Sequence, residues 1–441
     1  MSSGIILSIN HIIGEYFMLD INLIRENHKQ LEEGLRKRGV DISFDGLLKK
    51  DKDVKKLKGE NDSLKAKRNK VSKEIPALKK EGKEVDKIYE EMRLLGEEIQ
   101  KNDDKIKKLE SEIYSFLIEI PNVPDDDLVS GGKENNTIIK TYKKRPEFKF
   151  KPMNHVELSE KHNLIDYKRG VKIAGNGNCI YSGLGARLEW ALLNFFIDEH
   201  IKDNYQFMLI PHILNYKCGI GAGQFPKFED DVYKVNEGDT DKPKFLIPTS
   251  ETALLNVHSE EILPHEDLPK KYFSYSPCYR REAGSYRADE KGIIRSHQFN
   301  KIEMFQFTDI NGSDKAFYEL VKKAETLMEK LGLHYTTVKL AAGDCGASMA
   351  RTYDIEVFIP SMDKYIEVSS VSNARSYQAR RANIKYKDKN TQKNEFVHAL
   401  NGSGLATSRV VPAILEQYQQ EDGSIKIPKV LVKYMGIKKI G

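Results

Sequence analysis

Hydrophobic residues recur at alternating three- and four-residue steps through a lysine- and glutamate-rich stretch that runs from Asp51 to about Leu117. Two such frames flank residues 80–83, where Gly82 permits a chain reversal. The pattern predicts an antiparallel coiled-coil hairpin, and an arm of roughly thirty residues would extend about 45 Å. The first frame consists of Val54, Leu57, Leu64, Val71, Ile75 and Leu78. The second consists of Val85, Ile88, Met92, Leu95, Ile99, Ile106, Leu109, Ile113 and Phe116.

The first half of this hairpin is strongly basic, whereas the second half mixes charges of both signs. A phosphate backbone could lie along such a surface. A solvated surface of mixed charge is the alternative that the pattern leaves open. The basic residues are Lys52, Lys55, Lys56, Lys58, Lys65, Lys67, Arg68, Lys70 and Lys73.

The 441 residues and the 39% hydrophobic content are sufficient for two or three units with their own cores. Pro121 and Pro124 break the helical pattern, and beyond about residue 140 short β-branched runs alternate with helical stretches, which predicts an α+β domain on a mainly antiparallel sheet. We therefore expect an N-terminal extension at 1–17, a helical arm at 18–120, a linker at 121–139 and a larger domain at 140–441.

Charge and cysteine content narrow the class of protein. The formal net charge is only +5 although 31% of the residues are charged, so a nucleic acid would have to bind a local basic face. The four cysteines are widely separated, which predicts neither a disulfide framework nor a structural zinc site and favours a reducing cytoplasm. No stretch approaches the ~20 apolar residues of a membrane span.

The richest chemistry falls on two expected strands at 275–282 and 297–305. Alternation places Arg280 and Glu282 on one face of the first strand, and Phe299, Lys301 and Glu303 on one face of the second. A guanidinium, a ring and carboxylates on one sheet face suit a nucleotide, because arginine binds phosphate and a ring stacks on a base. For an isolated R-x-E pattern, a surface strand pair with salt bridges is the ordinary alternative.

This segment resembles motif 2 of class II aminoacyl-tRNA synthetases, in the form F/Y-R-x-E-A-G-S, a loop, then H-Q-F-x-K-x-E that the serine enzymes have. The resemblance implies that Arg280 contacts the α-phosphate and the substrate carboxylate, with Arg281 also in the ATP site. It implies that Glu282 contacts the adenine amino group, that Phe299 stacks on adenine and that Glu303 binds the serine hydroxyl.

Segments on both sides of motif 2 extend the resemblance. Upstream, Pro248–Glu251 is similar to the T-S-E segment of the family, which implies that Thr249 and Glu251 hold the amino acid. Downstream, residues 365–370 resemble the E-[IV]-S-S strand, which implies ATP binding by Glu367, Val368, Ser369 and Ser370, with Mg²⁺ held by Glu367 and Ser370.

Motifs 3 and 1 are also recognisable. Residues 401–409 match N-G-S-G and G-L-x-x-x-R, which implies that Ser403 lines the serine pocket and that Arg409 binds the γ-phosphate. Pro211 resembles the motif 1 proline at a homodimer interface.

Four departures from the family pattern stand out in the sequence. They are Ala222, the motif 2 loop at 286–291, Ser376 and the helix-interior Pro412. They would be compatible with a divergent second copy of the enzyme that resists a serine-mimicking inhibitor.

Taken together, the resemblance implies a serine-tRNA ligase of the bacterial type with ATP, L-serine and tRNA(Ser) as substrates, and tRNA bound across the dimer through the arm. It leaves open whether selenocysteine tRNA is also served. No side-chain nucleophile or base is evident, so Arg280, Arg409 and Glu367, the last through Mg²⁺, are expected to act by positioning and charge neutralisation. Two alternatives are a ligase that charges a carrier protein and a non-catalytic RNA-binding paralogue. The first would lack the arm, and the second would have lost motif residues such as Arg280.

Overall fold

The computed structural model describes Leu19 and residues 21–82, 84–236, 238, 242–282 and 292–441. It contains two compact units. The first comprises the described residues up to Glu33 together with Asp41–Ile120, and the second comprises Gly34–Val40 together with Pro121–Gly441. The expected N-terminal extension at 1–17 lies outside the described residues.

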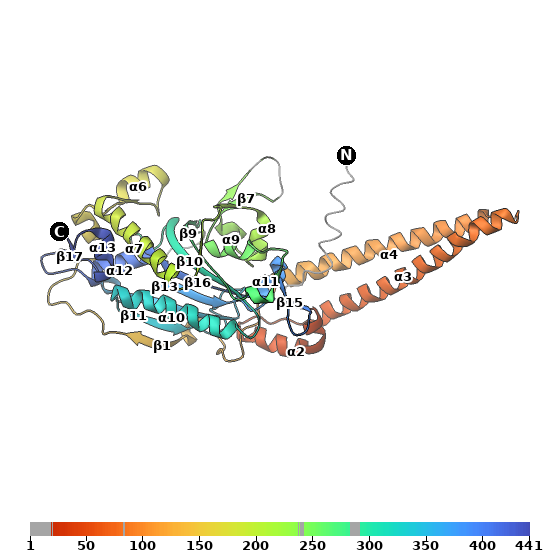
Figure 1. Ribbon diagram of the computed structural model, residues 1–441, viewed down its shortest axis with the longest axis horizontal. Coiled ribbons are helices and arrows are strands. Elements are labelled where there is room, and N and C mark those ends of the chain that lie inside the picture. The colour runs from red at the N-terminus through yellow and green to blue at the C-terminus, as the bar shows by residue number, and fades with distance from the viewer. Residues whose placement is uncertain (1–18, 20, 83, 237, 239–241, 283–291) are drawn as a thin grey trace. The chain divides into compact units, whose positions relative to one another are not determined.

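The first unit is built on a long helical hairpin, which confirms the predicted arm. Helices α3 (Asp45–Lys80) and α4 (Asp86–Glu119) run side by side, and α2 (Ile21–Lys37) precedes them (Figure 1). Every position of the two heptad frames is buried or half-buried. With 36 residues, α3 is longer than expected, and it continues through Pro76.

The polar residue Asn61 interrupts the apolar seam of the hairpin and is itself buried. Its Nδ2 donates to Oδ1 of Asp103 at 2.7 Å and lies 3.4 Å from the carbonyl oxygen of Ile99. This partner satisfies a donor that would otherwise be costly to bury. The contact therefore pins the register of the two helices at this level.

An eight-stranded sheet forms the centre of the second unit, which confirms the predicted α+β domain on a mainly antiparallel sheet. Its strand order is β1-β11-β12-β13-β16-β10-β9-β4, and every pairing is antiparallel except β4 with β9. The strands are β1 (Thr137–Tyr142), β4 (Gln206–Met208), β9 (Lys270–Tyr279), β10 (Gln298–Thr308), β11 (Tyr335–Lys339), β12 (Arg351–Ile359), β13 (Lys364–Asn373) and β16 (His398–Ala406).

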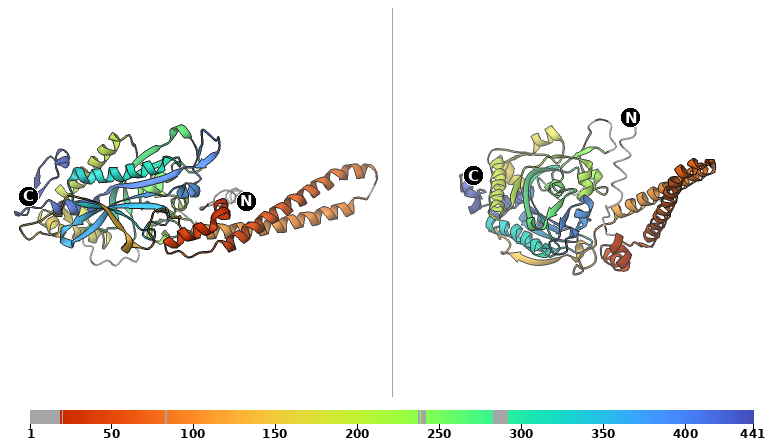
Figure 2. Two further views of the ribbon diagram at one scale, coloured as in Figure 1. Left: turned by 90° about the horizontal axis from the view of Figure 1, so that it is seen from below. Right: turned by 45° about the vertical axis from the view of Figure 1, so that its right-hand side comes forward.

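The two faces of this sheet have different surroundings. On one face, Ile302 and Met304 of β10 join a single core with α7 (Gly183–Lys202), α10 (Ser313–Leu331) and α12 (Thr407–Gln417). Figures 1 and 2 show α10, in cyan, lying along the sheet. On the other face, Phe305 and Phe307 pack with α9 (Ser250–Asn256) and α11 (Tyr377–Ala382). This second face also carries the candidate site.

The described residues include no helix long and apolar enough to cross a membrane.

Candidate functional site

A cavity of about 1060 Å³ opens on the sheet face described above. Its walls come from α9, β10, β12, β13 and β16, from the start of α12, and from loops far apart in the chain, including the one that carries Arg280. Seven of the residues singled out from the sequence line it: Thr249, Glu251, Arg280, Glu367, Ser370, Ser403 and Arg409. Residues from all of the recognised catalytic segments therefore converge on one cavity.

A smaller hollow shares Arg280, Glu367 and Arg409 with this cavity and adds Phe299 and Glu282 to the lining. Val368 lines it as well. The guanidinium carbon of Arg280 lies 5.2 Å from the centroid of the Phe299 ring, a cation–π arrangement. A ring can stack on a base and a guanidinium can bind phosphate, so the residues of this hollow suit a nucleotide.

Glu282 stands at the entrance to the motif 2 loop in an unusual backbone conformation, with φ of 51°. Nε of Arg295 donates to its Oε2 at 2.7 Å, so the carboxylate is held from the far side of the loop. Such strain in a residue other than glycine persists only where the surroundings enforce it. The loop itself, including the divergent residues at 286–291, lies outside the described residues.

Arg409 and Glu367 contact each other directly at the centre of the cavity. Nη1 of Arg409 donates to the carbonyl oxygen of Glu367 at 2.8 Å and lies 3.4 Å from its Oε1. Both side chains are partly exposed and line the cavity, so a ligand in the cavity can reach the guanidinium.

A connected polar network lies at the part of the cavity that Thr249 lines. Nζ of Lys301 donates to Oγ1 of Thr249 at 2.7 Å and forms an ion pair with Glu303. Nδ2 of Asn401 donates to Oε1 of Glu303 at 3.1 Å. Glu303 is fully buried and lies behind Thr249, which itself faces the cavity. The network therefore reaches the cavity through Thr249, Lys301 and Asn401.

Glu251 faces the cavity beside this network. Nε2 of Gln378 donates to its Oε1 at 2.7 Å. Burial, reinforced by the negative charge of Glu303, raises the pKa of Glu251 to about 7. A buried carboxylate whose pKa is raised in this way binds an ammonium group strongly, because the cation offsets the cost of burying the negative charge.

Two residues that the resemblance placed in the ATP site do not line the cavity. Nη1 of Arg281 donates to the carbonyl oxygen of Asp230 at 3.0 Å, and Arg281 is exposed. Oγ of Ser369 donates to the carbonyl oxygen of Ser403 at 2.6 Å inside the sheet. Their roles in binding ATP stay predictions. In the structure, both side chains donate to backbone carbonyl groups, those of Asp230 and Ser403.

Hard oxygen donors for a divalent cation are present on the cavity wall. Glu367 and Ser370 both line it, as does Asp354, which is only 9% exposed and whose Oδ1 receives no hydrogen bond from any described residue. Burial and the negative charge of Glu367 raise the pKa of Asp354 well above its usual range. A cation here would relieve that cost, so these residues fit Mg²⁺ bound together with phosphate oxygens. Among described residues, no group of three or more His, Cys, Asp or Glu is placed to hold a metal.

Several residues of the site lie beyond what the sequence predicts. Alternation places Lys301 on the correct face without giving it a role, and it gives none to Gln378, Asn401 or Arg295. The signal available for Lys301 is its position between Phe299 and Glu303 in the alternating strand. The contacts of the other three join partners more than ten residues apart in sequence, so no local pattern predicts them, although Asn401 belongs to the recognised N-G-S-G segment.

The departures from the family pattern have different surroundings. The carbonyl oxygen of Ala222 accepts a hydrogen bond from Nε2 of Gln378 at 3.0 Å, so this position acts through its backbone. Nε of Arg380 donates to Oγ of Ser376 at 3.2 Å. Pro412 is buried inside α12, which begins at Thr407, and nothing in the structure explains why a proline is tolerated there.

Comparison with known proteins identifies the family. The profile of the seryl-tRNA synthetase N-terminal domain matches residues 18–124, and that of the tRNA synthetase class II core domain (G, H, P, S and T) matches residues 233–418. A serine-tRNA ligase 2 from Clostridium acetobutylicum is 54% identical over 96% of this chain and 100% of its own length. The chain belongs to the seryl-tRNA synthetase family.

Further relatives support the same family assignment. A serine-tRNA ligase from Thermodesulfovibrio yellowstonii is 44% identical over 95% of this chain and 99% of its own. The crystal structure of a seryl-tRNA synthetase from Pyrococcus horikoshii complexed with ATP superposes with a TM-score of 0.89, at 34% identity over 96% of this chain and 99% of that one. The family therefore accounts for the arm and the sheet together.

Proposed function

We propose that this chain is an ATP-dependent serine-tRNA ligase. It activates L-serine to seryl-adenylate with release of pyrophosphate, and then transfers serine to the 3′-terminal adenosine of tRNA(Ser). The observation that carries the proposal is the convergence of Arg280, Glu367 and Arg409 on one cavity beside a buried amino-acid network.

Each end of the cavity suits one substrate. Adenine stacks on Phe299 with its amino group toward Glu282, and the phosphates extend between Arg280 and Arg409. Serine occupies the opposite end, with its ammonium group at Glu251 and Thr249 and its hydroxymethyl group toward Ser403 and the Glu303 network. Glu367 and Ser370 would hold Mg²⁺, which would neutralise charge on the phosphates.

The reaction needs orientation more than proton transfer. The carboxylate of serine attacks the α-phosphorus, the bond from that phosphorus to the bridging oxygen breaks, and pyrophosphate leaves. Arg280 holds the carboxylate and the α-phosphate together, whereas Arg409 neutralises charge on the leaving group. The carboxylate needs no general base because it is ionised at neutral pH.

We also propose a homodimer that forms through the region around Pro211. Large apolar side chains are exposed on α7 and directly after β4, among them Trp190 at 53% and Leu209 at 79%. Exposed apolar patches of this kind mark protein interfaces. The tRNA binds across this dimer and contacts the basic helix α3. The enzyme acts in the cytoplasm.

Serine-dependent exchange of pyrophosphate into ATP tests the proposal directly. Arg280→Ala should abolish the exchange, whereas Arg169→Ala, which removes an exposed arginine paired with Asp166 outside the cavity, should leave it unchanged. An amino-acid panel in the same assay should show exchange with serine alone. A near-normal rate for Arg280→Ala would refute the role of that residue, and exchange with another amino acid would refute the substrate.

A further inference from the structure

The guanidinium of Arg38 binds five backbone carbonyl oxygens of one distant loop. Its Nε donates to Ala342 at 3.1 Å, its Nη1 donates to Ala347 at 3.1 Å, and its Nη2 lies 2.8–3.2 Å from the carbonyl oxygens of three further residues. Those three are Cys345, Gly346 and Met349. Arg38 thus supplies side-chain donors to the carbonyl groups of a turning segment, of which those of Gly346 and Ala347 also accept a backbone N–H, from Met349 and Asn122.

The loop that Arg38 binds, residues 340–350, is a wall of the substrate cavity. Leu340, Asp344 and the run from Gly346 to Met349 line it. The loop also abuts the amino-acid end, since a Cβ built on Gly223 would lie 2.9 Å from Cβ of Ser348. Gly223 precedes Gln224, whose side chain accepts a hydrogen bond from Thr252 of α9. The position of the loop therefore sets the space beside Glu251 and Thr249.

A second segment holds the same loop from the other side. The backbone N–H of Asn122 donates to the carbonyl oxygen of Ala347 at 2.8 Å, and its Nδ2 donates to that of Ser348 at 3.0 Å. Further along, the N–H of Gly343 donates to the carbonyl oxygen of Gly131 at 2.8 Å. Residues 34–40 and 121–131, which precede and follow the helical hairpin in sequence, thus both grip one cavity wall.

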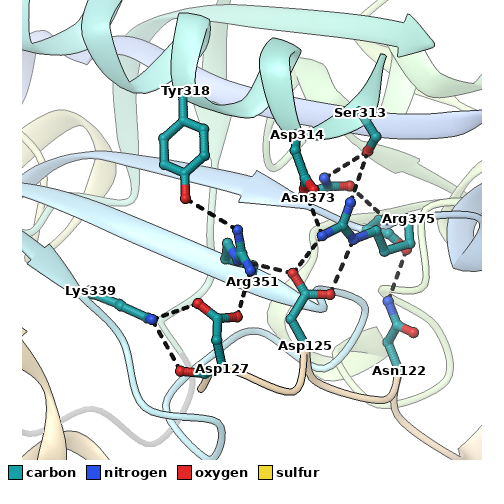
Figure 3. Close-up of polar contacts among 11 residues, drawn as sticks. Asn122, Asp125, Asp127, Ser313, Asp314, Tyr318, Lys339, Arg351, Asn373 and Arg375 are labelled. Atoms are coloured by element: carbon teal, nitrogen blue, oxygen red, sulfur yellow. Dashed lines mark hydrogen bonds and ion pairs between the residues drawn. The ribbon is translucent and has the colours of Figure 1, made fainter. Parts of the chain in front are cut away.

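Ion pairs fasten the second segment to the sheet (Figure 3). Asp125 pairs with Arg351 at 2.9 Å and with Arg375 at 2.7 Å. Asp127 pairs with Arg351 and with Lys339, each from the neighbouring strands. These ion pairs anchor residues 121–131 to the sheet. Residues 34–40 are bonded to this anchor, because the N–H of Gly131 donates to the carbonyl oxygen of Lys37 at 3.1 Å. Arg38, which follows Lys37, then binds the loop.

We propose that Arg38 is a positioning residue for serine activation: it holds loop 340–350 in the shape that closes the amino-acid end of the cavity. This rests on the proposed ligase function. Arg38 touches no substrate itself and acts through the carbonyl groups that it orients. A lysine cannot replace it, because one ammonium group has three donors and lacks the planar fork that spans five acceptors.

Steady-state pyrophosphate exchange with the full-length chain tests this inference. Arg38→Lys should raise the KM for serine about tenfold while kcat stays within about twofold, because uniform binding is lost and the reacting groups are intact. The KM for ATP should change less, since the loop packs against Gly223 beside the amino-acid end of the cavity. Arg169→Ala is the control: it removes an exposed arginine that lies outside the loop and outside residues 121–131, and it should leave the serine KM unchanged.

A second variant keeps the test decisive if Arg38→Lys does not fold. Asn122→Ala removes the side-chain bonds to the carbonyl oxygens of Ser348 and Ala374 and should also raise the KM for serine selectively. An unchanged serine KM in a folded Arg38→Lys, or in Asn122→Ala where the first variant is lost, would overturn the inference. Absence of exchange in the wild-type chain would instead overturn the ligase function, so the two failures are distinguishable.

Discussion

Replacing Glu189 by glutamine should stabilise the protein at alkaline pH and leave its stability unchanged in acid. Glu189 lies on α7 and is only 3% exposed. Its Oε1 accepts hydrogen bonds from Nδ2 of Asn300 at 2.8 Å and from Oγ1 of Thr407 at 2.5 Å. Glutamine keeps that acceptor, so the variant reproduces the protonated acid and removes only the buried charge.

The size of the effect follows from the pKa of this carboxyl group. Burial, partly offset by the bonds from Thr407 and Asn300, raises the pKa of Glu189 from 4.5 to about 7. One pKa unit corresponds to about 1.4 kcal/mol, so ionising Glu189 in the folded state costs about 3 kcal/mol. Between pH 4.5 and 7 the folded state keeps the proton of Glu189, whereas the unfolded state loses it. The free energy of unfolding is therefore undiminished below pH 4.5, and it falls as the pH rises through 7.

Thermal unfolding followed by circular dichroism measures this difference. For a unit of this size, about 3 kcal/mol corresponds to an increase in Tm of roughly 4 °C. Glu189→Gln should show that increase at pH 8.5 and none at pH 4.5. Glu199→Gln, on the same helix, is the opposite control: burial alone would raise the pKa of Glu199, but Lys202 and Lys330 lower it below its usual value. Glu199→Gln should lower the Tm at pH 8.5. For Glu189→Gln, an equal difference in Tm from the wild type at both pH values would refute the reasoning.

Three further predictions concern the cavity, the sheet and the arm. The KM for serine should rise as the pH falls from 8 to 6, since protonation of Glu251, whose pKa is about 7, removes an ammonium acceptor. Glu251→Gln should abolish this pH dependence of KM, and the same pH profile in the variant and the wild type would contradict the prediction. Gly404→Ala would place a Cβ 2.4 Å from Nε2 of His200 and should destabilise by about 1–3 kcal/mol, measured by denaturant unfolding; an unchanged midpoint would show that the sheet yields there. Deleting residues 51–117 should preserve pyrophosphate exchange and cripple tRNA charging; equal loss of both activities would remove the proposed role of the arm.

The features that can be predicted from the sequence are those that repeat locally. The heptad frames predict the hairpin because each apolar position is specified by its neighbours three and four residues away. In the same way, two-residue alternation correctly separates Lys301 and Glu303 from Ile302 and Met304, which lie in the core. The start of α3 at Asp45 escapes prediction because no capping pattern marks it, and its N-cap residue makes no side-chain hydrogen bond.

Long-range contacts cannot be predicted in this way. Arg38 and its loop are more than 300 residues apart, and Glu189 and Thr407 are 218 residues apart. An arginine that ends a helix normally looks like a solvated C-terminal charge, because such cations are common there. Only the folded chain reveals that this guanidinium faces carbonyl groups. For the same reason, the burial of Glu303 behind Thr249 is outside the reach of strand alternation.

The assignment of Gly34–Val40 to the second unit constrains how a chain of this kind could be shortened. A truncated form, or a natural descendant, that begins after the hairpin would lose these seven residues and with them the carbonyl clasp of Arg38. Excision inside the hairpin, from Asp41 to Ile120, would retain them. A minimal domain for serine activation should therefore be made by internal deletion of residues 41–120. A version that lacks residues 1–120 should still bind ATP but should bind serine more weakly.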